Sequence, residues 1–474
     1  MKYQVEKYQK ELTDLNRVIW EAAELKFQEF ISSAAAAGLL EKHGFRVETG
    51  TGGLPTAFRA VYGSGHPVIG ILAEYDALDG LSQQEGMFER CPRPETIHGH
   101  GCGHNLLGTG AVAAALDLRE YLDRNPGSGT VIVYGCPAEE GGSGKTIMAG
   151  AGVFDEIDAA LTWHPCTINA SMGCAMVGNC QAYFRFSGIS SHAGNAPQKG
   201  RSALDAVELM DVGVNFLREH MEMTDRIHYA VTNTGGISPN VVQSEAEVLY
   251  LVRSRTNDSV KELFERVCDV ARGAALMTDT SVEIRFDKAC SNVIPNEVLG
   301  RLAYEQMVRL GPPDYTDAER EYVRKYRELA GEKAVAEDDG AVPHYEMDQR
   351  RQLMADHPMG DFILPYRLVS AVQTGSSDMG DVSQIVPLVQ IETACFTQGS
   401  PGHSWLWAAQ GTSSYAMKGA LFAGQVLSET AKQLMEHPEV LEAAREEQKR
   451  RMGGKPYVCP IPEEYRKTEE RSAQ

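Results

Sequence analysis

A chain of 474 residues with 43% hydrophobic content is long enough to form a large core and two or three structural units. Its 45 basic and 65 acidic residues give a formal net charge of −20, which disfavours binding to nucleic acid or to an anionic membrane surface. No apolar run is long enough to span a bilayer, and the first residues lack the apolar segment of a secretory signal. We therefore expect a cytoplasmic protein. The ten cysteines form no C-x-x-C pair, so we expect most of them to be reduced and buried.

The first part of the chain predicts a parallel sheet covered by helices. Apolar residues from Val5 to Ala22 recur every three or four positions, which indicates an amphipathic helix, and a second helix is expected around Ile31 to Leu40. Three short apolar runs alternate so little that they predict strands buried on both faces: Val68 to Asp76, Thr130 to Glu140 and Ala159 to Pro165. An alanine-rich stretch from Asn105 to Arg124 predicts a helix capped by Asn105. This order is typical of the α/β class.

A second module begins near residue 181, where the expected order of elements becomes strand, helix, strand, strand, helix, strand. That is the order of a ferredoxin-like α+β unit. We place this inserted module at residues 181–293 and the two parts of the larger catalytic domain at 1–180 and 294–474. The region from about 312 to 367 is a charged insertion, in which EDDGAVPHYEMD predicts an exposed loop. A strand at VPLVQIETACF and a long helix from Thr412 to His437 complete the larger domain.

Side chains suited to metal binding follow several of the predicted strands. Glu139 and Glu140 come directly after one strand and His164 after another, so they should meet at the carboxyl edge of the sheet, where open α/β sheets bind ligands. The glycine-rich segment HGHGCGHN adds Cys102 and His104, with His98 and His100 nearby, and a late loop could return His403 to the same edge. Thiolate, imidazole and carboxylate groups are ligands of Zn or Mn.

Each of these residues also has an ordinary structural explanation. Buried cysteines and hydrogen-bonded histidines are common, His403 could be a surface residue, and Asp76 could cap a turn instead of orienting a histidine ligand. The pair Glu139 and Glu140 argues for cations, because adjacent carboxylates in a partly buried site repel each other unless positive charge offsets them. One carboxylate could then bind metal while the other accepts a proton from the attacking water.

Two other chemistries are disfavoured by the sequence. GGSGKT resembles the end of a phosphate-binding loop, but that motif requires glycine where Glu139 stands. The chain also lacks a G-x-S-x-G segment, so it offers no nucleophilic serine of the α/β-hydrolase type.

Six segments, in this order, resemble the aminoacylase and hippuricase branch of the dimetal peptidase and amidohydrolase superfamily: HGHGCGHNLLGTG, CPAEEGGSGKT, TWHP, SSHAGNAPQKGRSALDA, GGISPNVVQ and GSPGHSW. The resemblance implies a catalytic domain that binds two divalent ions, Mn or Zn, and an inserted lid domain that also forms a dimer. It implies five metal ligands: Cys102, His104, Glu140, His164 and His403. It implies Glu139 as the general base, with Asp76 supporting the ligands. From the lid it implies three substrate-contacting residues: His192, Asn240 and Arg253. Glu74 departs from the family pattern, which has aspartate or histidine at that position.

The resemblance further implies hydrolysis of the amide bond of an N-acyl or N-aroyl amino acid, with p-aminobenzoyl-glutamate as the leading substrate. His192 would act in the active site of a neighbouring subunit, and Arg253 would bind the substrate carboxylate. A dipeptidase or an indoleacetyl-amino-acid hydrolase remains an alternative on the same scaffold. An alternative of another class is a non-catalytic subunit that binds a related partner. The expected assembly is a homodimer, with a heteromer of related subunits also possible.

Overall fold

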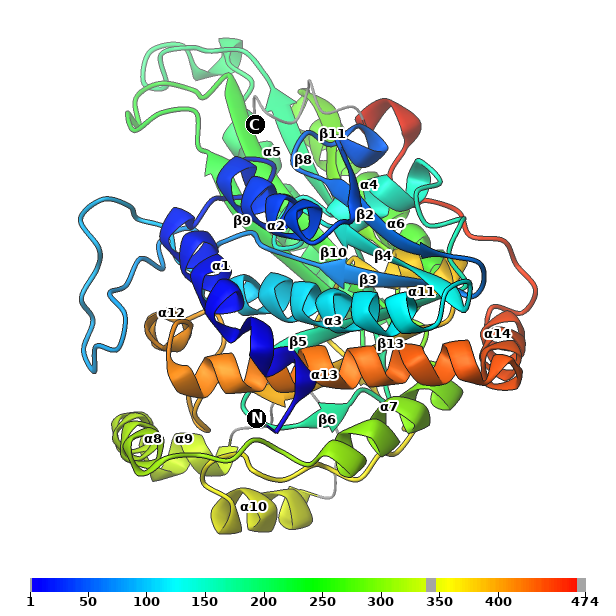
Figure 1. The fold of residues 1–474 in the computed structure, drawn as a ribbon. Coiled ribbons are helices and arrows are strands. Elements are labelled where there is room, and N and C mark those ends of the chain that lie inside the picture. Colours follow the sequence, from blue (N-terminus) through cyan, green and yellow to red (C-terminus); the bar gives the residue numbers. More distant parts are fainter. Residues whose placement is uncertain (1, 338–346, 467–474) are drawn as a thin grey trace.

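The computed structural model describes residues 2–337 and 347–466. Its central sheet has seven strands, and Figure 1 shows how the elements are arranged around it. The strands lie in the order β1 (Arg46–Thr49), β2 (Phe58–Ser64), β4 (Gly129–Gly135), β3 (Val68–Ala73), β5 (Ala159–Cys166), β13 (Leu388–Ala394) and β6 (Ala170–Ser171). The four strands from β4 to β13 are parallel, whereas β2 and β6 are antiparallel to their neighbours. The predicted mostly parallel sheet is confirmed, and all three apolar runs lie in its centre.

Helices cover both faces of this sheet. One face packs on α1 (Gln9–Ala22), α2 (Phe30–Lys42), α3 (His104–Arg124), α7 (Glu297–Leu310) and α13 (Ser414–Glu436). The other face packs on α4 (Gly144–Gly150), α11 (Met379–Ile385) and the nearest strands of the second sheet. The larger domain also contains α12 (Trp405–Gln410) and α14 (Pro438–Arg451). Short 3-10 helices occur at Gln4–Tyr8, Thr51–Gly53, Pro197–Lys199, Arg218–His220 and Glu463–Tyr465.

The predicted cap of α3 is wrong. The helix begins at His104, and Gly103, in the left-handed region at φ 81°, precedes it. Asn105 lies inside the first turn, fully buried, and its amide donates to Asn16 Oδ1 and Gly411 O. Asn105 therefore ties three segments together, a role that depends on contacts with distant parts of the chain.

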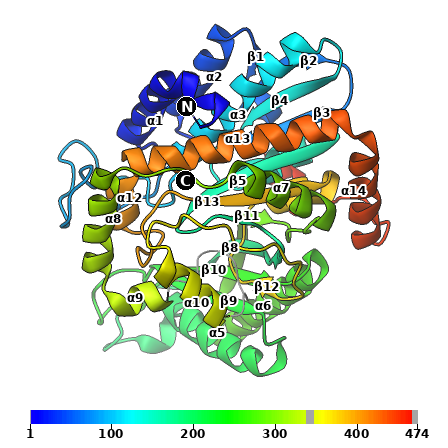
Figure 2. The same ribbon diagram turned by 60° about the horizontal axis from the view of Figure 1, so that its bottom comes forward.

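A second sheet of four antiparallel strands lies beside the central one, in the order β11 (Ser281–Cys290), β8 (Gly178–Ser187), β10 (Glu245–Ser254) and β9 (Arg226–Asn233). Two helices, α5 (Ala203–Leu217) and α6 (Asn257–Thr278), cover one of its faces. The order along the chain is the predicted β-α-β-β-α-β, and we call this unit the lid. In Figure 2 the lid, drawn in green, lies at the opposite side of the molecule from α1 and α2.

The charged insertion contains α8 (Asp317–Ala330), α9 (Glu332–Glu337) and α10 (Met347–Asp356). The loop predicted for EDDGAVPHYEMD lies mostly outside the described residues. A small parallel sheet joins β7 (Ala175–Met176) to β12 (Val372–Gln373). All ten cysteines are free, and seven of them are buried. Among the described helices none is long and apolar enough to cross a membrane.

Candidate metal centre

The side chains expected to bind metal meet at the carboxyl edge of the parallel strands. Glu139 and Glu140 follow β4, and His164 lies near the end of β5 itself. Cys102 and His104 stand where the glycine-rich loop enters α3, and His403 lies between β13 and α12. Parallel strands bring their carboxyl ends to the same edge, so segments that are far apart in the sequence become neighbours there.

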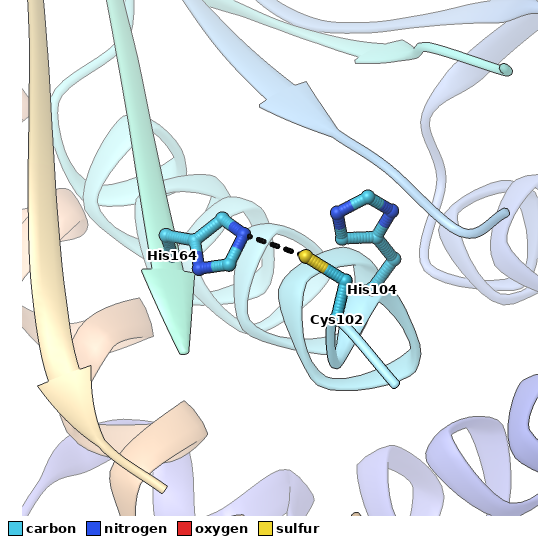
Figure 3. A group of neighbouring side chains, drawn as sticks. All are labelled: Cys102, His104 and His164. Atoms are coloured by element: carbon cyan, nitrogen blue, oxygen red, sulfur yellow. Dashed lines mark hydrogen bonds between the residues drawn. The ribbon is translucent and has the colours of Figure 1, made fainter. Parts of the chain in front are cut away.

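Cys102, His104 and His164 form the first of three groups whose donor atoms lie within 4.8 Å of one another (Figure 3). His164 Nε2 lies 3.4 Å from Cys102 Sγ, and its Nδ1 lies 2.8 Å from the carbonyl of Pro165. Because that carbonyl can only accept a hydrogen bond, Nδ1 carries the proton and Nε2 presents its lone pair to the group. Burial lowers the pKa of His164 to about 4, which keeps the ring neutral and able to coordinate.

Asp76 holds two members of the cluster in place. Its Oδ1 lies 2.8 Å from His104 Nδ1, and its Oδ2 accepts a 2.9 Å hydrogen bond from the backbone amide of Glu140. A carboxylate on Nδ1 leaves Nε2 of His104 as the coordinating atom, which is the usual arrangement behind a metal-bound histidine. Asp76 therefore couples the loop after β4 to the start of α3.

Cys102, Glu140 and His403 form the second group. His403 Nε2 lies 3.4 Å from Glu140 Oε1. The backbone amide of His403 donates a 2.8 Å hydrogen bond to Gly101 O, which ties its loop to the glycine-rich segment. His403 is 59% exposed and has φ 53°, so a strained backbone presents this candidate ligand on the open side of the cluster.

Glu74, His104 and Glu139 form the third group. Glu74 Oε2 lies 3.3 Å from His104 Nε2. Burial, together with the negative charges of Glu74 and other carboxylates, raises the pKa of Glu139 well above its usual range. Added positive charge beside Glu139 would favour its carboxylate form.

Lys145 places one positive charge among these carboxylates, and the sequence analysis did not identify it as part of the site. It is fully buried in α4, lies 2.8 Å from Glu74 Oε1 and also pairs with Asp378, which in turn accepts a 2.8 Å hydrogen bond from the Lys145 amide. Lys145 belongs to the GGSGKT segment, which only resembles a phosphate-binding loop. The sequence signal for Lys145 was its position shortly after Glu139 and Glu140, but its partner Asp378 lies 233 positions away.

The chemistry of this cluster fits bound divalent cations. His104 Nε2 and Glu140 Oε1 are buried and have no hydrogen-bond partner, although buried polar atoms are normally satisfied. Both atoms belong to the groups described above, so a cation would complete them. The first two groups share Cys102, and together they contain all five residues expected to be ligands.

Two further histidines of the glycine-rich segment do not join the cluster. His98 Nδ1 lies 3.0 Å from Asp79 Oδ1, and the buried His100 lies 2.9 Å from Ile19 O through Nε2. These contacts make them structural residues of the loop.

The three lid residues belong to none of the three groups. His192 and Asn240 are close together, because the amide after His192 donates to Asn240 O at 2.9 Å. The Nδ1 atom of His192 accepts hydrogen bonds from the amides of Gly194 and Asn195, which leaves its Nε2–H free to donate. Arg253 is partly buried, and its guanidinium donates to Ser376 Oγ at 2.9 Å.

Comparisons with known proteins identify relatives of this chain in sequence and in fold. The chain is 43% identical over 464 residues to a p-aminobenzoyl-glutamate hydrolase subunit of Escherichia coli, covering 95% of this chain and 94% of that protein. It is 34% identical over 318 residues to Xaa-Arg dipeptidase of Mus musculus, covering 63% of this chain and 68% of that protein. The fold matches the YXEP protein of Bacillus subtilis, a dinuclear metal-binding peptidase, with a TM-score of 0.56 at 19% identity over 91% of this chain and 99% of the other. Residues 70–463 match the description of Peptidase family M20/M25/M40, and the chain therefore belongs to that family.

Proposed function

We propose that this protein hydrolyses the amide bond of an N-acyl or N-aroyl amino acid in a metal-dependent reaction, with p-aminobenzoyl-glutamate as the leading substrate. The observation that carries the proposal is the convergence of Cys102, His104, Glu140, His164 and His403 from four separate segments. The substrate is inferred from the name of the 43% identical relative, which aligns along almost the whole chain.

The proposed ligands would hold two divalent cations. One thiolate, three imidazoles and one carboxylate form a borderline-soft donor set suited to Zn or Mn. When bound, such ions polarise a carbonyl group and lower the pKa of water from 15.7 to about 7. Burial raises the pKa of the Cys102 thiol, and a cation would reverse this effect because coordination favours the thiolate.

In this proposal, the chain's own residues position the substrate and move protons. Glu139 accepts a proton from the attacking water and delivers it to the leaving amine. Asp76 keeps His104 and Glu140 oriented through its two carboxylate oxygens. Arg253 binds the substrate carboxylate with its planar fork of donors, and Asn240 contacts the substrate from the lid.

We assign His192 to the active site of a neighbouring subunit. Its Nε2–H points away from the two amides that fix the ring, and the Nδ1 contacts to those amides are themselves exposed. A donor of this kind would stabilise negative charge on the carbonyl oxygen. The assembly is then a homodimer, or a heteromer with a related chain, as the word subunit in the relative's name suggests. We take residues 181–293 as the lid that forms the dimer, between catalytic parts 1–180 and 294–474. Ten free cysteines fit a reducing compartment such as the cytoplasm.

A hydrolysis screen tests the proposal. The chelated protein is supplied with Mn or Zn and given p-aminobenzoyl-glutamate, indoleacetyl-aspartate and simple dipeptides. We expect p-aminobenzoyl-glutamate to be cleaved fastest and chelation to abolish cleavage. A preference for dipeptides or indoleacetyl conjugates would select one of the alternative substrates. Failure on every amide, with metal bound, would support the non-catalytic alternative.

A further inference from the structure

The face of the lid sheet that α5 and α6 leave uncovered carries two basic residues beside the candidate metal centre. Arg253 in β10 and Cys290 in β11 both pair with Asn179 in β8, and Lys288 in β11 pairs with Gln181. Because side chains alternate along a strand, residues two positions apart share a face. All five residues therefore lie on one face, opposite Cys180 and Ala182, which pack toward the helices.

Lys288 lies against the loop that holds the two glutamates. Its Nζ donates a 3.5 Å hydrogen bond to the backbone carbonyl of Glu140. The charged groups that act on the buried Cys290 thiol are Asp381, Asp378, Lys288 and Glu139, and the thiol in turn acts on Arg253. Lys288 therefore lies next to the loop of the proposed general base, and Arg253 lies two strands away on the same face of the sheet.

Arg253 and Lys288 have no ion-pair partner in the part of the chain that the structure describes. Within residues 2–337 and 347–466, no carboxylate lies within 4 Å of Arg253 or Lys288. Burial lowers the pKa of Arg253, which shows that the surroundings disfavour an unpaired charge there. A partly buried cation without a counterion is costly, and a bound anion offsets that cost.

Asn179, between the two cations, adds an independent indication of a ligand. Its side chain is buried, and its Oδ1 has no hydrogen-bond partner. A buried acceptor of this kind is normally satisfied, and a substrate N–H group would satisfy it.

We infer that Lys288 is a specificity-determining residue that binds the side-chain carboxylate of an acidic amino acid, while Arg253 binds the α-carboxylate. The inference rests on the proposed function and narrows its substrates to N-acylated dicarboxylic amino acids. Arg253 suits the carboxylate common to all N-acyl amino acids because its donors are planar and paired, whereas Lys288 offers a single point charge.

The test compares hydrolysis of p-aminobenzoyl-glutamate with that of p-aminobenzoyl-glutamine, which differs only in the charge of the side chain. The wild type should prefer the glutamate compound by about tenfold or more, as expected for a hydrogen bond between charged groups. Lys288→Met should remove most of this preference, mainly through a higher KM for the glutamate compound, whereas Lys288→Arg should retain it.

Arg285→Met is the matched control. Arg285 lies on the same strand and face but farther along, where it stacks on Tyr183 with 4.3 Å between guanidinium and ring centroid. This variant should keep the wild-type preference. Metal content, measured by elemental analysis, should be equal in all four proteins. The dissociation constant of p-aminobenzoyl-glutamate, measured in a Glu139→Gln background, should rise when Lys288→Met is added.

Each outcome decides between the two proposals. If the wild type cleaves no N-acyl amino acid, the proposed function fails. If it cleaves them and Lys288→Met lowers both rates equally, or leaves the preference intact, only the role of Lys288 is overturned. If Lys288→Met lowers both rates equally, Lys288 would instead serve to balance the charge of Glu139 and Glu140.

Discussion

Glu139 and its neighbour Glu140 differ in what surrounds them. Glu140 has its amide fixed by Asp76 and its carboxylate directed to His403. Glu139 faces Glu74 and other carboxylates, which raise its pKa together with burial. This difference supports a ligand role for Glu140 and a proton-transfer role for Glu139.

Glu139→Gln should lower kcat by about 10²- to 10⁴-fold, the range of general acid–base catalysis, because an amide cannot carry the proton. Metal content should stay at the wild-type level, as measured by elemental analysis. Cys102→Ser is the contrasting variant, because it removes the candidate ligand shared by two groups and should lose metal. Full turnover by Glu139→Gln would exclude the base role.

Glu392 lies in β13 and interacts electrostatically with Arg350 of the charged insertion. It is 1% exposed, and burial raises its pKa from 4.5 to about 7, while Arg350 of α10 opposes the shift. The folded state therefore holds this proton more tightly than the unfolded chain does. The resulting stability is fully present below pH 4.5 and is lost as the pH rises through about 7.

Glu392→Gln should weaken this pH dependence. A shift of this size corresponds to about 3 kcal/mol, so the free energy of unfolding of the wild type should fall by that much more than that of the variant between pH 4.5 and 8. Urea unfolding at several pH values measures the difference. The exposed Glu446→Gln in α14 should follow the wild type, and parallel curves for Glu392→Gln would contradict the assignment.

At the scale of elements, α8 and α9 of the insertion contact two loops of the candidate metal centre. Tyr326 of α8 donates a 2.8 Å hydrogen bond to Met87 O, in the segment that leads to Cys102. Arg327 donates to Gln398, and Val335 of α9 packs against Gly399, both in the segment that leads to His403. These contacts give the insertion a supporting role at the centre.

Gly399→Ala should disturb this support. Gly399 has φ 84°, and an added Cβ would lie 2.8 Å from Val335 Cγ2 and 2.9 Å from Val335 N. We expect a loss of about 2 kcal/mol or more of stability, since the left-handed conformation alone costs an alanine about 1–2 kcal/mol. Metal affinity should fall as well, because His403 is displaced.

Gly80→Ala is the control that separates the cost of a left-handed backbone from the effect of the contact with Val335. Gly80 also has a positive φ, of 71°, but an added Cβ would meet nothing within 4 Å. Denaturation and Mn titration of both variants should show a smaller loss of stability and unchanged metal affinity for Gly80→Ala. Equal metal affinity in the two variants would show that the insertion does not support His403.

At the scale of the whole molecule, the lid carries His192 and Asn240 apart from the three groups of candidate ligands. If His192 acts in a neighbouring subunit, the active site is completed only by assembly. The edge strand β9 and the apolar side chains of α5, such as Phe216 at 72% exposure, lie on the same lid.

Mixing two inactive variants tests this arrangement. His192→Ala and Glu139→Gln should each be inactive alone, and co-expression should restore part of the activity, because a mixed dimer contains one site with both residues intact. The measurement is the activity of the purified mixture relative to the sum of the separate proteins. No recovery despite formation of mixed dimers would place His192 in its own chain's site.

The sequence by itself determined the α/β class, the order of elements in the lid and the residue types at the carboxyl edge of the sheet. These follow from local periodicity and from the position of polar residues after buried strands, which the chain carries in short windows. Only the tertiary structure decided that Asn105 joins distant segments instead of capping α3, that Lys145 pairs with both Glu74 and Asp378, and that Lys288 shares a face of the lid sheet with Arg253. Such contacts join residues far apart in the chain, and they depend on sheet order and packing that no local pattern encodes.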